Sequence, residues 1–69
     1  MNRNDFLKLC QQNAKYPKSV KVKSEGIIYY PYALKICFNN SGETLNLAIL
    51  KDTKANSITY ADVKEVEEL

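Results

Sequence analysis

The sequence predicts an α+β domain that is mainly β, with one N-terminal helix followed by a five- to six-stranded antiparallel sheet or partly open barrel. Apolar residues recur at helical spacing before Pro17 and mostly with a period of two after it. Clusters of Gly, Asn and Ser separate the alternating segments, as turns between strands do. A chain of 69 residues has the length of one small domain. We therefore expect a single domain over residues 1–69, with the helix in 1–17 and the sheet or barrel in 19–67.

Residues 4–15 are expected to form a helix of about three turns. Asn2 or Asn4 can cap its first amide groups. Pro17 ends it, because the residue before a proline is disfavoured in helical geometry. One apolar stripe then faces the rest of the domain, made of Phe6, Leu9, Cys10 and Ala14.

The segment 20–30 is expected to form a hairpin in which valines alternate with lysines. A three-residue loop ending at Gly26 is the preferred connection. It places Val22 opposite Ile28 and leaves Tyr29 on the outer face. A two-residue turn would instead set Val22 opposite Tyr29 and exchange the faces of the neighbouring tyrosines.

A second hairpin is expected where "YALKICF" and "ETLNLAIL" flank the turn cluster 39–42. A loop of two or four residues keeps the two apolar sets on one face, and one such register pairs Ile36 with Leu45. A three-residue loop would break that match. Pro31 marks a site where a bulge can form. The expected core residues of this segment share a parity: Ile28, Tyr30, Tyr32, Leu34, Ile36 and Phe38.

The same register creates a second face with small residues, including Ala33 and Ala48. The helix can pack on that face or cap the open end of a barrel. Further along, "SITY" is expected to form a short strand and "VKEVEEL" a final one after a tight turn. Its acidic residues are typical of a solvated strand edge, where charge discourages pairing.

The succession of a short basic strand, two long hairpinned strands, a short strand, a helical turn and a last strand resembles an SH3-like small barrel over residues 19–67. The segment from Gly26 to Leu69 also looks similar to small uncharacterised proteins of Gram-positive phages and conjugative elements, which implies an accessory role in a mobile element. The barrel resemblance implies binding of peptides or nucleic acids rather than catalysis. It brings no functional residues with it.

The sequence offers no catalytic, metal or cofactor site. It lacks histidine, the commonest general base and neutral metal ligand. Cys10 and Cys37 are too far apart for a CxxC motif and are expected to be reduced, buried thiols. We expect a non-enzymatic protein without cofactors.

The absence of a long apolar run predicts no membrane span and a cytoplasmic location.

Charge is unevenly spread, because seven of the ten basic residues lie in 1–35 and six of the eight acidic residues lie in 36–69.

An adaptor that binds an unknown protein partner through an aromatic face is the favoured function. Nucleic-acid binding through lysines and a stacking tyrosine is the alternative, and a homodimer through sheet edges is a further possibility. The candidate binding face consists of Tyr29, Lys15, Lys18, Lys21, Lys23 and Lys35.

Overall fold

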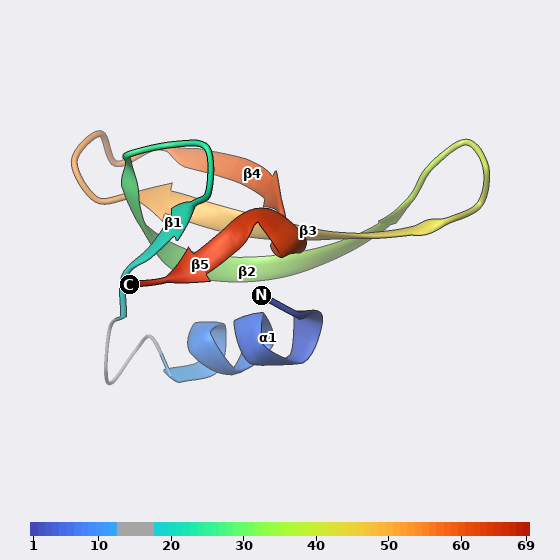
Figure 1. The fold of residues 1–69 in the computed structure, drawn as a ribbon, viewed down its shortest axis with the longest axis horizontal. Helices are drawn as coiled ribbons and strands as arrows, with labels where there is room; N and C mark the ends of the chain where they lie inside the picture. The colour runs from blue at the N-terminus through green and yellow to red at the C-terminus, as the bar shows by residue number, and fades with distance from the viewer. Residues whose placement is uncertain (13–17) are drawn as a thin grey trace.

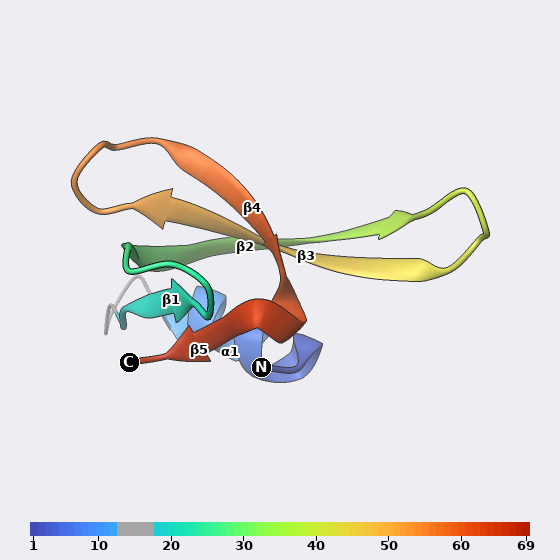
Figure 2. The ribbon, with the colours of Figure 1, turned by 45° about the horizontal axis from the view of Figure 1, so that its top comes forward.

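The computed structural model describes residues 1–12 and 18–69 and contains one helix and five strands. The strands form one antiparallel sheet in the order β4-β3-β2-β1-β5. In Figure 2, β4 and β5 lie at opposite margins of the sheet, which is not closed into a barrel. The predicted α+β, mainly β class is confirmed. The elements are α1 (Arg3–Gln12), β1 (Val20–Val22), β2 (Ile28–Phe38), β3 (Thr44–Asp52), β4 (Ile58–Asp62), the 3-10 turn η1 (Val63–Glu65) and β5 (Val66–Glu68).

The helix covers one face of the sheet and lies beside β2 and β5 (Figure 1). Asn2 caps it, since its Oδ1 atom accepts the Asp5 N–H at 2.8 Å. Ala48 lies on the face that the helix covers, which agrees with the expectation that the helix packs on the face carrying Ala48. Ala33 was expected on the same face but lies on the other one. The expected helix end at Pro17 lies outside the described residues. Within the described segments, no helix has the length and apolar character needed to cross a membrane.

The core is small and forms between α1 and the covered face of the sheet. Phe6 and Leu9 supply the helical stripe, and Cys10 packs partly buried against it. Burial raises the pKa of the Cys10 thiol, which favours its protonated form. Both cysteines are free. The buried residues are Phe6, Leu9, Val20, Val22, Tyr29, Ala48, Leu50, Val63 and Val66.

The hairpin of β1 and β2 has neither of the registers expected from the sequence. Val20 lies opposite Tyr29. The chain turns where the Glu25 N–H donates to the Val22 carbonyl, and it continues through Gly26 before pairing begins at Ile28. The three-residue loop was therefore wrong. The longer connection gives the tyrosines the same faces as the two-residue turn would, so Tyr29 points inward.

The hairpin of β2 and β3 is confirmed, but its predicted register is wrong by one residue: Ile36 lies opposite Asn46. The Asn39 N–H donates to the Glu43 carbonyl, so three residues separate this closing pair. The Asn39 side chain accepts the N–H groups of Ser41 and Glu43, and Gly42 adopts a positive φ of 80°. These contacts favour a three-residue loop. With this loop, the alternating apolar residues of β2 and those of β3 lie on opposite faces of the hairpin.

A bulge interrupts the ladder between Pro31 and Ala33, at the site where the proline predicted one. Tyr32 is the extra residue and is 58% exposed. The bulge reverses the parity of β2, so Pro31 and Leu34 both belong to the covered face. The predicted core set was therefore wrong for every member except Leu34, which packs against the core.

The far end of the β2–β3 hairpin projects beyond α1, β1, β4 and β5 (Figures 1 and 2). We call residues 34–46 the arm. Two of its apolar side chains are largely uncovered, with Ile36 49% and Phe38 72% exposed. The arm accounts for the elongated shape of the molecule, which measures 36 × 22 × 18 Å.

Candidate binding surface

Tyr29, the aromatic centre of the predicted site, is buried. Only 5% of it is exposed, and its phenolic O–H donates to the Glu25 carboxylate at 2.6 Å. This hydrogen bond, together with burial and the nearby charges of Glu25 and Asp52, raises the pKa of Tyr29 to about 12. Tyr29 is thus a core residue with a satisfied hydroxyl, and its placement on a binding face was wrong.

The predicted lysines do not form one cationic patch. Lys18 forms an ion pair with Glu68 at 3.3 Å, and Lys21 forms one with Glu67 at 3.5 Å. Both pairs arise because the acidic β5 lies beside the basic β1 in the sheet. The charge asymmetry along the chain is therefore partly cancelled in the fold. Lys15 lies outside the described residues.

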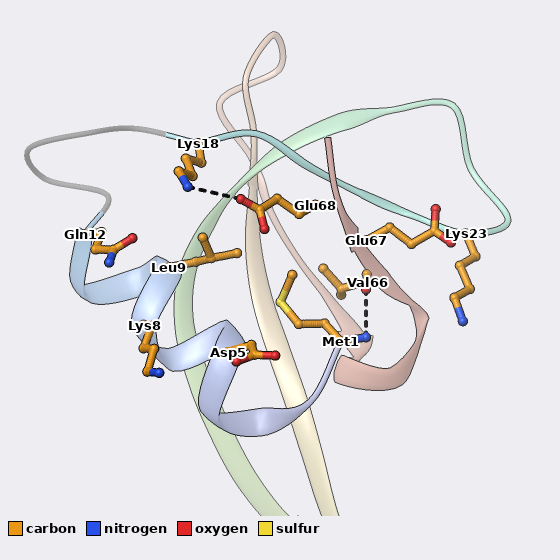
Figure 3. A pocket seen from close by; sticks show the side chains of 10 residues that line it. All are labelled: Met1, Asp5, Lys8, Leu9, Gln12, Lys18, Lys23, Val66, Glu67 and Glu68. Carbon is orange, nitrogen blue, oxygen red and sulfur yellow. Dashed lines mark hydrogen bonds and ion pairs between the residues drawn. The ribbon is translucent and has the colours of Figure 1, made fainter.

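Lys18 and Lys23 line a groove of about 570 Å³ between α1 and β5 (Figure 3). The Met1 ammonium donates to the Val66 carbonyl at 3.1 Å on its floor. Cations and carboxylates are interspersed along its walls, so the groove presents no field of one sign to a polyanion. The charged side chains that line it are Asp5, Lys8, Lys18, Lys23, Glu67 and Glu68.

The face of the sheet opposite α1 carries a different cluster, which we call the tyrosine face. Because side chains alternate along β3, the buried Ala48 and Leu50 place Leu47, Ile49 and Lys51 on this opposite face. Their partners on β2 and β4 share the same face. The resulting rows are Tyr30–Lys51–Ile58, Ala33–Ile49–Tyr60 and Lys35–Leu47–Asp62.

Large side chains on the tyrosine face are open to solvent. Tyr30 is 37% exposed, Ile58 50% and Tyr60 61%. Ile49 lies between them, half-buried by its neighbours. Aromatic and aliphatic side chains that surround one another on an uncovered surface are typical of an interface core.

The charges on this face lie beside its apolar centre. Lys51 lies between Tyr30 and Ile58, while Lys35 lies at the beginning of the arm. Asp62 is occupied in a cap, because its Oδ1 atom accepts the Lys64 N–H at 2.9 Å. Neither Lys35 nor Lys51 forms an ion pair with the described residues.

Lys21 and Lys35 do lie on the side of the sheet that faces away from the core, as the sequence predicted. The tyrosines that share this side are Tyr30, which the prediction placed in the core, and Tyr60, which it placed on the surface near Tyr29. The alternation of valine with lysine from Val20 to Val22 was the signal available in the sequence. Only with the correct loop length does this alternation identify Tyr30 as the outward residue.

A second groove, of about 460 Å³, lies at the base of the arm between the start of α1 and η1. Asn46 borders it, and its buried Oδ1 atom accepts no hydrogen bond from the described residues. Among these residues there is also no cluster of His, Cys, Asp or Glu that could hold a metal ion.

Comparison with protein-family models, with curated proteins and with solved structures finds no match for this chain. The likeness to SH3-like barrels and to proteins of mobile elements therefore stays a prediction.

Proposed function

We propose that the chain is a small non-catalytic interaction module that binds a protein partner through the tyrosine face. The observation that carries the proposal is the exposure of Tyr30, Ile58 and Tyr60 around Ile49 on an open sheet. Tyrosine supplies a large rigid contact area and a polar end, and it is enriched among the residues that dominate binding energy. Burying this cluster against a partner would remove it from water.

The partner should present an apolar surface with a nearby carboxylate. Ile49 and Ile58 need apolar contacts, whereas Lys51 and Lys35 need negatively charged ones. An open sheet face suits a helix or another sheet better than it suits a small molecule, because it does not enclose a ligand.

A second candidate is the binding of single-stranded nucleic acid. It is supported by the direct pairing of Tyr30 with Lys51, since a ring can stack on a base while the adjacent ammonium contacts a phosphate. The aliphatic share of the face and the ion pairs of Lys18 and Lys21 favour a protein instead.

Photo-cross-linking tests the proposal. A benzoyl-phenylalanine in place of Tyr60 should give a discrete protein adduct in host extract, and the same group in place of Leu7 should not. Leu7 is a matched control because it is 40% exposed on α1. The adduct should be lost when Tyr30→Ser is added. Equal adducts at both positions, or an adduct that survives Tyr30→Ser, would contradict the proposal.

Fluorescence titration with single-stranded oligonucleotides at two salt concentrations separates the two candidates. Nucleic-acid binding predicts an affinity that falls steeply with salt and that weakens in Lys51→Gln. The protein-partner proposal predicts no oligonucleotide binding at physiological salt. Tight, salt-dependent binding would replace it with the second candidate.

A further inference from the structure

From Leu34 to Phe38, β2 has a free edge on the side where β1 lies. Of the residues of β2, β1 pairs only with Ile28 and Tyr29, whereas β3 pairs with β2 along almost its whole length. The part of β2 in the arm is therefore a two-stranded ribbon with β3 and has no strand on its other side within the described residues.

The backbone groups on this edge can be assigned. The Asn39–Glu43 pair is hydrogen-bonded, and antiparallel ladders alternate between bonded and non-bonded pairs. Cys37 and Lys35 therefore direct their N–H and C=O groups toward β3. The residues that direct theirs to the free edge are Leu34, Ile36 and Phe38, and no hydrogen bond from the described residues reaches them.

This edge has few of the features that normally prevent strand pairing. Proteins protect edges with charge, proline or a covering element. The segment 34–38 holds one lysine and no proline, and its Ile36 and Phe38 side chains are exposed. The β5 edge differs, since it ends in Glu67 and Glu68.

We propose that the arm is a homodimerisation element, in which β2 pairs antiparallel with β2 of a second copy and Ile36 lies opposite the partner's Ile36. In this register Leu34 lies opposite the partner's Phe38, so every N–H and C=O of the three edge residues is paired. Apolar side chains face apolar side chains on the α1 side of the ribbon. On the other side Lys35 lies opposite the partner's Cys37, whereas centring the pair on Lys35 would oppose two like charges.

The complete pairing of the edge N–H and C=O groups and the contact of apolar with apolar side chains favour a second copy as the occupant of the edge, and the charge pattern favours this register. A two-fold axis between antiparallel strands of one sheet is perpendicular to that sheet, so both copies keep their tyrosine faces on the same side. The dimer would present two tyrosine faces side by side, and a partner with two matching sites would bind it with higher avidity.

Sedimentation velocity across a concentration series tests the dimer directly. We expect a species of twice the 7.9 kDa chain mass to accumulate with concentration. Ile36→Lys should raise the dimer dissociation constant at least tenfold, because it places like charges opposite each other at the axis. The control is Ile58→Lys, at a side chain with 50% exposure on β4, which should leave the constant unchanged. A monomer at all concentrations, or equal effects of both lysines, would overturn the proposal.

Disulfide trapping tests the register. In a Cys10→Ala and Cys37→Ser background, Ile36→Cys should give a cross-linked dimer on mild oxidation, since directly opposed residues bring their Cα atoms to about 5.5 Å. Ile58→Cys should stay monomeric. Cross-linking at Ile58→Cys alone would overturn the proposed axis. This outcome is independent of the tyrosine face, so the dimer and the proposed function can fail separately.

Discussion

Val20 and Tyr29 lie directly opposite each other in the β1–β2 ladder, and both side chains enter the core. This single pairing determines which tyrosines face solvent. With Tyr29 inward, the alternation of the strand turns Tyr30 outward, next to Lys51 of β3. The exposed aromatic surface of the molecule therefore depends on the loop that sets this register.

Replacing Tyr29 and Tyr30 with alanine, one at a time, tests the pairing of Val20 with Tyr29. Tyr29→Ala should lower the free energy of unfolding by about 3–5 kcal/mol, because it removes a buried ring. Tyr30→Ala should lower it by less than Tyr29→Ala does, because Tyr30 is already 37% exposed. Urea unfolding followed by circular dichroism measures both. A larger loss for Tyr30→Ala would reverse the assignment of the faces.

The hydrogen bond between Tyr29 and Glu25 predicts a loss of stability in alkali. The pKa of Tyr29 is raised from 10 to about 12 in the folded protein, so the folded state keeps a proton that the unfolded state has lost. The free energy of unfolding should therefore fall as the pH rises from 10 to 12. Glu25→Gln should shift the tyrosinate absorbance of Tyr29 to lower pH. An unchanged titration in this variant would show that the carboxylate does not hold the phenol.

Alanine substitutions at Leu50 and Ile36 test the extent of the core. Leu50 is fully buried, so Leu50→Ala should cost about 2–5 kcal/mol. Ile36→Ala should cost less than about 1 kcal/mol, since half of that side chain is already exposed in the arm. Thermal melting compares the two at low protein concentration, where pairing of the arm does not contribute. Equal losses would mean that the core extends into the arm.

Asn46 should be replaceable with a gain in stability. Its Oδ1 atom is buried without a hydrogen-bond donor among the described residues, and an unsatisfied buried polar group costs about 1–3 kcal/mol. Asn46→Leu removes that group and adds apolar contact beside Ile36. We expect a higher melting temperature for this variant. A decrease would indicate that Asn46 is hydrogen-bonded in solution.

The helix, the strands and the bulge were predictable because each depends on local signals. Phe6 and Leu9 have helical spacing, valines alternate in β1, and Pro31 interrupts the ladder. The two registers were not predictable in the same way. They depend on loop hydrogen bonds of Glu25 and Asn39, and a change of one residue exchanges the faces of a whole strand.

The candidate surface was missed for the same reason. The sequence correctly placed Lys21 and Lys35 on the outer side, but the wrong loop length paired them with Tyr29 instead of Tyr30. Tyr60 could not be placed beside Ile49 until the register of β3 with β4 was known. The ion pairs of β1 with β5 were also hidden, because these strands are far apart in the sequence.

The central claim is that the tyrosine face binds a protein partner. Its most direct test is to purify the partner that photo-cross-linking identifies and to titrate it calorimetrically into three forms of the protein. The wild type should bind, and Ile58→Ser with Tyr60→Ser should weaken the dissociation constant at least tenfold, because both side chains belong to the tyrosine face. Leu7→Ser, on the exposed side of α1, should bind as the wild type does. An unchanged affinity in the double variant, or a loss confined to Leu7→Ser, would contradict a binding role for the tyrosine face.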